Sequence, residues 1–310
     1  MIHIATYPPV PATLSDPNLT ASRFLQNPGF VARRMQDLGD LRYVGTSLLT
    51  GRQDASGGAV GYEQVEGIFA DASPEIVAPG GEYTLTTISD GPAGLARVAK
   101  YGKDTIVTDE AIKRRNMDPV NKGILKLVNS AALVIDQAVV SVVASAITNT
   151  QNASALWTSA TPKVLQDILR AKAKVRGLNL GYEPNALLVE DEVWAYLASD
   201  TVIAGAMARE SATNPVYTGR FEVLAGLQVI PTPAANLPGG ANSNAWIVDT
   251  NQLGFIATED LGGGYQAAGE LVQSKVIRED HNDGWRLRAR ANFVPVVTDP
   301  GAGFKITGVA

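Results

Sequence analysis

The strongest hydrophobic pattern in the chain predicts a single long helix from Asp118 to Ile147. Apolar residues recur there at steps of three and four positions, and polar residues occupy the opposite face. Asp118 and Pro119 supply an N-cap followed by proline at the first helical position. About 28 residues at roughly 1.5 Å each make a helix on the order of 42 Å long, which we call the spine helix. A shorter helix, capped by Asp109 and ending at Arg115, is expected just before it.

Beyond the spine helix, helical and strand patterns alternate. Helices are predicted over 162–176 and 191–198, and buried strands over 186–189, 226–230, 245–248 and 254–257. Two long alternating runs, 271–279 and 285–297, flank a polar turn at 280–284 and predict a hairpin. Helices and strands therefore both occur in this part of the chain.

The first hundred residues predict extended segments rather than a domain. Residues 1–50 hold five prolines between short apolar groups and lack a sustained pattern. The stretch 27–49 is too apolar for a solvated tail, which implies either a partner surface or a short helix near 30–38. Residues 51–97 hold alternating runs at 63–68 and 83–88 with turn residues between them, which predict a two-stranded ribbon. An isolated ribbon is marginal in water. We therefore expect the ribbon, and the arm before it, to bury their apolar side chains on neighbouring molecules.

Composition removes most enzymatic chemistry from consideration. The 310 residues include no cysteine and only two histidines, at opposite ends of the chain. Disulfides, thiolate zinc sites and cysteine nucleophiles are therefore excluded, and the commonest acid–base side chain is nearly absent. The chain also lacks a G-x-S-x-G turn and any phosphate-binding or dinucleotide-binding glycine motif. We predict no catalytic residue, no cofactor site and no metal site.

No targeting or membrane segment is expected. Residues 1–11 lack a basic cluster followed by an apolar core. The apolar stretch 124–147 is long enough to span a bilayer, but it contains polar and charged residues such as Lys126 and Asp136, which are costly in lipid.

Charge is distributed unevenly along the chain. The net charge is −5, and the region from Gln53 to Asp90 holds seven acids and no Lys or Arg. A block rich in Lys and Arg follows, from Arg97 to Lys126. Opposite patches steer association and fix register between subunits; a solvated surface with accidental segregation is the alternative. The predicted contact joins three acids of one chain to three bases of a neighbour, namely Glu63, Glu66 and Glu82 to Lys113, Arg114 and Arg115.

Four segments carry a resemblance to a known family: 101–110 before the spine helix, 185–189 before a short helix, 226–231, and 246–249. In this order they resemble the major capsid protein of tailed double-stranded DNA phages, and this resemblance implies the α+β Hong Kong 97 fold. The resemblance covers nearly the whole chain. It implies four parts: an N-terminal arm at 1–50, an extended loop at 51–97, a peripheral domain at 98–150 with 272–310, and an axial α/β domain at 151–271.

The resemblance also implies a function without catalysis. The chain would assemble in the host cytoplasm into pentamers and hexamers of an icosahedral head around double-stranded DNA, and would reside in the virion. A portal, a scaffolding protein and a cement protein are the implied protein partners, and no membrane is involved. The packaged DNA would be held without sequence specificity, with Arg33 and Arg34 of the arm as candidate inner-surface contacts.

Two departures from the family pattern change the expectations. Some members carry a helical scaffolding segment before the arm, whereas this arm begins almost at Met1, so a separate scaffolding protein is expected. Some members cross-link the shell through a lysine of the extended loop, but the first lysine here is Lys100. An encapsulin-like compartment is the nearest alternative, and it is disfavoured because such proteins look shorter at the front and have a helix in place of the proline-rich arm. An α/β enzyme is the distant alternative.

Overall fold

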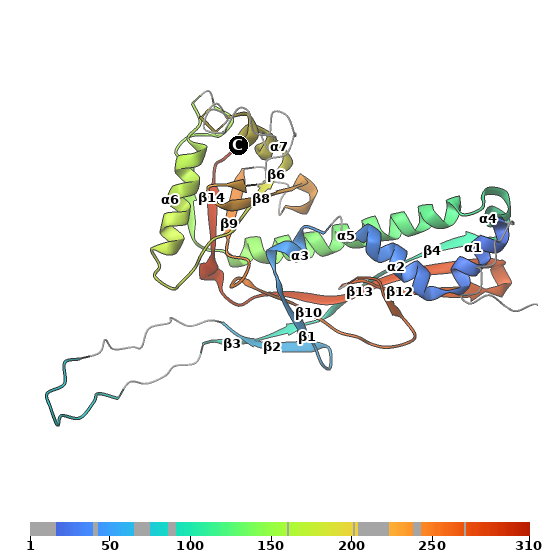
Figure 1. Ribbon diagram of the computed structural model, residues 1–310, viewed down its shortest axis with the longest axis horizontal. Helices are drawn as coiled ribbons and strands as arrows, with labels where there is room; N and C mark the ends of the chain where they lie inside the picture. Colours follow the sequence, from blue (N-terminus) through green and yellow to red (C-terminus); the bar gives the residue numbers. More distant parts are fainter. Residues whose placement is uncertain are drawn as a thin grey trace, which may run out of the picture. The chain divides into compact units, whose positions relative to one another are not determined.

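The computed structural model describes residues 17–39, 43–64, 75–85, 91–159, 161–200, 202–203, 223–237, 243–269 and 271–310. The chain divides into two compact units. Figure 1 labels their helices and strands. The first unit draws on Met1–Arg42, Lys100–Ala132 and Leu261–Asn292, and the second on Tyr43–Ala99, Leu133–Asp260 and Phe293–Ala310. Helix α5 (Asp118–Ala146) and strand β13 (Gly284–Val297) each contribute a part to both units.

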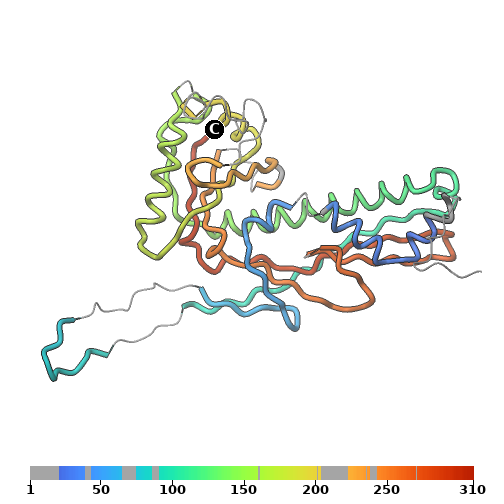
Figure 2. Tube along the Cα trace, viewed as in Figure 1, coloured from blue at the N-terminus to red at the C-terminus, as the bar shows by residue number. Residues whose placement is uncertain are grey.

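The first unit is a small sheet with helices beside it. Its remaining strands are β4 (Ala99–Thr108), β11 (Gln266–Ala267) and β12 (Gln273–Glu279), and its helices besides α5 are α1 (Pro17–Gln26), α2 (Pro28–Gly39) and α4 (Asp109–Arg115). Strands β12 and β13 form the predicted hairpin, which closes at the Glu279–Gly284 pair through a 3-10 turn, η3 (Asp280–Asn282). Figure 2 shows the two strands running side by side to this tip. Strand β4 pairs with β13, and β11 with β12.

The arm is more structured than the sequence indicated. The prediction of a helix near 30–38 is confirmed by α2, but α1 was missed. Helix α2 packs on β12 and β11 of the same chain, and Leu25, Val31 and Met35 are almost completely buried. Val31 and Met35 stand four residues apart on one helical face. The expectation that the arm needs a neighbouring molecule is therefore wrong for its described part, because a helix lets its apolar side chains reach the chain's own sheet.

The second unit contains a six-stranded sheet in the order β5-β14-β9-β6-β8-β7. Its strands are β5 (Thr150–Asn152), β6 (Ala186–Glu190), β7 (Val223–Leu224), β8 (Leu227–Thr232), β9 (Asn244–Val248) and β14 (Gly303–Thr307). Strand β6 is parallel to β8 and antiparallel to β9, and all five of its residues are buried. A strand buried at successive positions is covered on both faces. Helix α6 (Val164–Arg176) packs on β14 and β9, whereas α7 (Asp191–Ser199) packs on β6 and β8.

A second group of strands in this unit anchors the ribbon. Strand β1 (Gly51–Asp54) runs parallel to β10 (Gly254–Thr258), which pairs with the last residues of β13. The ribbon strands β2 (Ala59–Glu63) and β3 (Ala93–Arg97) pair with each other, and Val60 packs against Ala257 and Val296. The sequence predicted that the ribbon begins at residue 51, whereas β1 pairs with β10 and extends its sheet. Two short 3-10 turns, η1 (Ala234–Asn236) and η4 (Pro300–Ala302), complete the unit.

The periodic segments beyond residue 108 were predicted well. Helices α4, α5, α6 and α7, strands β6, β8, β9 and β10, and the β12–β13 hairpin all lie where the pattern placed them. The cap of α4 is a correction, because the Thr108 hydroxyl accepts the Ala111 N–H while Asp109 binds elsewhere. Strand β4 was missed, since most of its side chains are exposed and show no hydrophobic alternation. Strands β5 and β14 were also missed.

Helix α5 has the length of a membrane-spanning segment. Within the described part of the chain, it is the one helix long and apolar enough to cross a bilayer. In its most apolar stretch, 44% of the residues are buried inside the protein. Ile124, Ile135 and Val139 are among its completely buried side chains, so its apolar face forms core.

Asp136 on α5 joins that helix to the short helix α3 (Gly45–Leu48) in the second unit. Its Oδ1 accepts the backbone N–H groups of Val44, at 3.0 Å, and Gly45, at 2.8 Å. The side chain is only 3% exposed. Burial raises the pKa of Asp136 from its usual 3.8 to about 6, although the two N–H groups act in the opposite direction.

This burial predicts a pH-dependent stability. Between the usual pKa of 3.8 and the folded pKa of about 6, the folded protein binds more protons than the unfolded one, so the Asp136 contribution falls as pH rises through that window. Two pKa units correspond to about 3 kcal/mol. Asp136→Asn keeps an oxygen acceptor without the charge. We expect its free energy of unfolding, measured by urea titration, to exceed that of the parent above pH 6 and to converge with it near pH 4. A constant difference at all pH values would contradict this.

Candidate subunit interfaces

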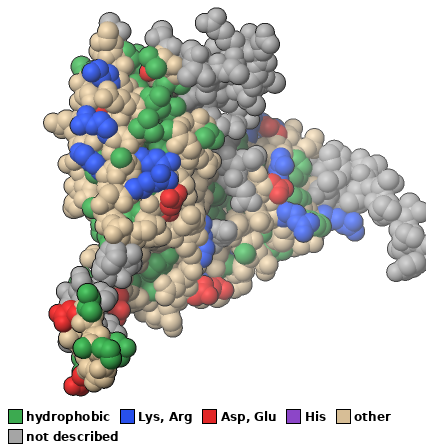
Figure 3. All heavy atoms as spheres, turned by 60° about the vertical axis from the view of Figure 1, so that its left-hand side comes forward, with side chains coloured by type: hydrophobic (Ala, Val, Ile, Leu, Met, Phe, Trp, Pro, Cys, Tyr) green, Lys and Arg blue, Asp and Glu red, His purple; other side chains and the backbone are tan. Residues whose placement is uncertain are grey.

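The ribbon presents apolar and acidic side chains to solvent. Residues 75–85 contain no strand, and Ile76 and Leu85 are fully exposed while Tyr83 is 82% exposed. Figure 3 shows hydrophobic and acidic side chains together on this projecting loop. Isolated exposed leucines are ordinary, but a cluster of large apolar side chains with no core beneath it marks an interaction surface. The sequence predicted the acids here and an apolar run that includes Tyr83 and Leu85, but it did not single out Ile76.

The predicted ribbon strands are only partly correct. The strand at 83–88 is wrong for its described part, 83–85, which has no pairing partner there. Of the run at 63–68, Glu63 ends β2, and the remainder from 65 lies outside the described residues. Glu63 and Glu82 are exposed, whereas Glu66 lies outside the described residues.

The three predicted bases lie together at the end of α4. Lys113, Arg114 and Arg115 form the last turn of the helix and are exposed. Asp109 and Glu110 occupy its first turn, so the charges follow the helix dipole. Asn116 ends the helix with a positive φ of 55°. Within the part of the chain that is described, none of the three bases forms an ion pair, so their charge is available to a partner.

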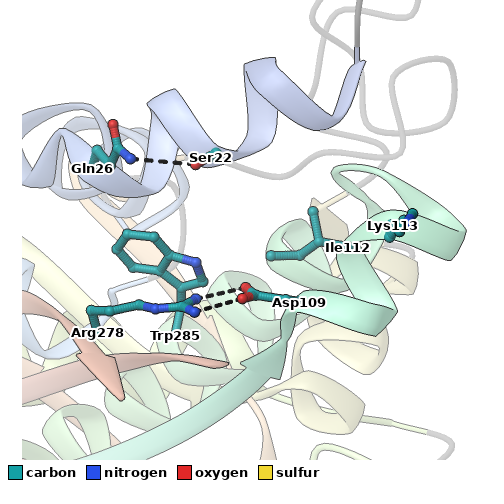
Figure 4. A pocket seen from close by; sticks show the side chains of 7 residues that line it. All are labelled: Ser22, Gln26, Asp109, Ile112, Lys113, Arg278 and Trp285. Atoms are coloured by element: carbon teal, nitrogen blue, oxygen red, sulfur yellow. Dashed lines mark hydrogen bonds and ion pairs between the residues drawn. The ribbon is translucent and has the colours of Figure 1, made fainter. Parts of the chain in front are cut away.

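A cavity of about 510 Å³ lies beside these bases in the first unit. Figure 4 shows that helix α1 contributes Ser22 and Gln26, helix α4 contributes Asp109, Ile112 and Lys113, and the hairpin contributes Arg278 and Trp285. The cavity therefore combines an apolar wall with polar groups from three separate chain segments.

Two charged groups of this cavity, Arg278 and Asp109, are already paired with each other. Arg278 binds Asp109 through two contacts of 2.6 and 2.7 Å, and it also binds Asp280 at 3.0 Å. The hydrogen bond to Asp109 is the main cause that raises the pKa of Arg278 above its usual range, and the hydrogen bond to Asp280 adds to it. Arg278 therefore stays charged. Its guanidinium also lies 5.2 Å from the centre of the Trp285 ring. Among the cavity's charged groups, Lys113 is left to interact with an incoming acid.

A second charge cluster ties the hairpin to β4. Arg288 binds Asp104 through two hydrogen bonds of 2.7 and 2.8 Å, and Arg286 binds Glu279 at 2.6 Å. The Arg288 hydrogen bond holds the pKa of Asp104 below its usual value. These charges are neutralised within the chain, so they are not candidate interface residues.

The two arm arginines occupy adjacent positions on α2. Arg33 and Arg34 are both exposed, next to the buried pair Val31 and Met35. Their contact with DNA stays a prediction. Among the described residues, no three His, Asp or Glu side chains gather in a way that could hold a metal ion.

The fold is that of proteins that build closed shells. The chain is similar to the capsid protein of cyanophage P-SCSP1u, with 14% identity over 86% of this chain and 88% of that chain and a TM-score of 0.63. It is similar to a virus-like particle protein from Pyrococcus furiosus, with 13% identity over 89% and 97% of the two chains and a TM-score of 0.57. A third neighbour is the SrpI encapsulin of Synechococcus elongatus, with 12% identity over 84% and 85% and a TM-score of 0.54.

The sequence itself places the chain among these proteins. A family model described as phage capsid protein matches residues 93–306, and no curated protein sequence matches. Because the match covers more than half of the chain, the chain belongs to the phage capsid protein family. It is therefore a structural, shell-forming protein of the phage virion rather than an enzyme, as the resemblance implied, and it has the α+β Hong Kong 97-like fold.

One argument from the sequence fails. Encapsulin-like proteins were set apart by a helix in place of a proline-rich arm, but the arm of this chain itself contains two helices, α1 and α2. Prolines Pro17 and Pro28 are the first residues of these helices, a position where the missing N–H is harmless. The helices of the arm therefore do not distinguish a phage capsid protein from an encapsulin-like protein. The match to the phage capsid protein family supports the phage capsid protein.

Proposed function

We propose that this protein forms the icosahedral head of a tailed phage from pentamers and hexamers that enclose double-stranded DNA. The observation that carries this proposal is the ribbon. Its base is anchored in the second unit by Val60, while Ile76, Tyr83 and Leu85 are exposed and have no partner surface among the described residues of their own chain. A shell of repeated copies supplies that surface from a neighbour. Large interfaces built from several moderate contacts are usual in such assemblies.

Electron microscopy of the expressed protein tests the proposal. Shells large enough to package a genome, which take up DNA in infected cells, are the expected result. Small shells with enclosed protein cargo would favour the encapsulin-like alternative. The structural similarity to the SrpI encapsulin is the reason to test for it. A soluble protein that forms no shell at any concentration would count against both.

We propose further that the ribbon of one subunit contacts the basic end of α4 on another. Glu63, Glu66 and Glu82 are the acids, and Lys113, Arg114 and Arg115 the bases. The exposed apolar side chains near Glu82 match the cavity wall of Ile112 and Trp285 beside Lys113. Apolar contact would supply most of the affinity, and the charges would set register and orientation.

The remaining partners follow the family resemblance. We propose a portal, a scaffolding protein and a cement protein as protein partners. Arg33 and Arg34, exposed on α2, are proposed to contact packaged DNA without sequence specificity. Phosphate contacts of this kind weaken steeply with salt.

The shell should lack covalent cross-links. No lysine occurs before Lys100, so the ribbon has no amine to attack a neighbour's asparagine. We expect mature particles boiled in detergent to give one band at the mass of the single chain on a denaturing gel. Because the chain contains no cysteine, any ladder of larger bands would reveal another covalent link and would refute this prediction.

A further inference from the structure

An apolar groove on the second unit has no role in the contacts proposed so far. It has a volume of about 550 Å³ and lies along one side of α6, where Leu165, Leu169 and Ala173 follow each other at four-residue steps. Asp200 and Val202, which follow α7, form the other wall. Leu169 is 48% exposed and Val202 is 60% exposed. Figure 3 shows a stripe of hydrophobic side chains with Lys and Arg beside it on this unit.

The edge of the groove is basic. Lys163 and Arg170 both line it and are exposed. Asp200 is the one acid among the described residues of its lining, and it is buried and accepts the Val202 N–H at 3.0 Å. An occupant with an apolar side chain next to a carboxylate would match both features.

Helix α7 carries such a surface. Asp191 and Glu192 form its first turn and are exposed, and in the described part of the chain neither pairs with a cation. A third acid, Glu190, precedes them. Burial is the main cause that raises the pKa of Glu190, and the charges of Glu192 and Asp191 raise it further. Tyr196 stands one turn after Glu192 on the same face and is 38% exposed.

Closed rings require two different patches on each subunit. A contact between identical patches produces a dimer, whereas a contact between different patches continues from copy to copy and closes into a ring. We propose that the α6 groove of one copy binds the α7 face of the next copy in the same ring, with Tyr196 in the groove and Glu192 facing Arg170 or Lys163. This inference rests on the proposed assembly into pentamers and hexamers.

Introduced cysteines test the contact directly, because the natural chain has none. Leu169→Cys and Tyr196→Cys chains are prepared separately, mixed, assembled and treated with a short bis-maleimide. We expect a dimer band in the mixture and none with either variant alone. Leu178→Cys replaces Leu169→Cys in the control mixture; Leu178 is also an exposed leucine, at 41%, but it lies outside the groove.

Each outcome has a separate meaning. Particles that form without a Leu169–Tyr196 dimer overturn this contact and leave the proposed function intact. A dimer from Leu169→Cys alone would show that two grooves face each other, which also overturns it. If the unmodified chain forms no particles, it is the proposed function that fails.

A second variant measures the strength of the contact. Leu169→Glu places a carboxylate in the groove opposite Asp191 and Glu192, and we expect the concentration needed for assembly to rise about ten-fold or more. Leu178→Glu should leave it unchanged. Equal behaviour of the two variants, with both chains folded by circular dichroism, would contradict the proposal.

Discussion

A chain carrying Glu63→Lys, Glu66→Lys and Glu82→Lys is expected to remain folded and to form no shells at physiological salt. The three substitutions change the ribbon charge by six units and bring lysines to the exposed bases Lys113, Arg114 and Arg115 of the proposed partner. Like charges placed across an interface cost several kcal/mol, and the penalty recurs in every copy of a shell. Sedimentation of the assembly reaction, with electron microscopy of the pellet, measures the loss.

A charge exchange provides the control for this prediction. Adding Lys113→Glu, Arg114→Glu and Arg115→Glu to the same chain reverses both patches and should restore assembly. Because Glu63 and Glu82 are exposed and none of the three bases is ion-paired in the described structure, neither set of changes should alter the fold. Normal shells from the ribbon triple variant would eliminate the pairing; failure of the exchange to rescue would mean that the ribbon acids contact some other surface.

The second large effect concerns the fold and depends on one glycine. Gly254 begins β10 and pairs with Val297 of β13. A methyl group at this position would lie on top of the backbone carbonyl oxygen of Val296, with the Val297 Cα at 2.9 Å. Backbone atoms cannot rotate away as a side chain can, so Gly254→Ala must shift β10 from β13. We expect a loss of about 3 kcal/mol in the free energy of unfolding, measured by urea titration.

The matched control is Gly61→Ala. Gly61 also lies in a strand, β2, but a methyl group there would meet nothing within 4 Å and its φ is not positive. Its stability should stay within about 1 kcal/mol of the parent protein. If the two variants were equally stable, the close packing of β10 on β13 would be wrong.

The sequence predicted the elements whose side chains alternate between core and solvent. The spine helix, α6, α7 and the β12–β13 hairpin have a repeating apolar face, because each buries one side against its own chain. Strand β4 has no such face and was missed. The proline-rich start concealed α1, since proline at the first helical position reads as a break in a sequence pattern.

The charged residues proposed for the subunit contact could be identified from the sequence, but their ion-pair partners could not. The acids of the ribbon and the bases of α4 stand out because charges of one sign are close together along the chain. Only the tertiary structure decides which charges are already paired. Asp109, predicted as a helix cap, binds Arg278, which lies 169 residues away, whereas Lys113 on the same helix has no acid partner in the described residues.

By itself, the sequence determined the periodic helices and strands, the absence of cysteine chemistry and the segregation of charge, because these depend on composition and on local periodicity. The tertiary structure decided which apolar side chains have a partner within the chain. Met35 and Val31 on the arm are covered by the chain's own sheet, whereas Ile76, Leu85 and Leu169 remain exposed. Burial is a property of contacts between residues distant in sequence, so hydrophobicity alone could not distinguish the core of this capsid protein from the surfaces proposed to join its copies.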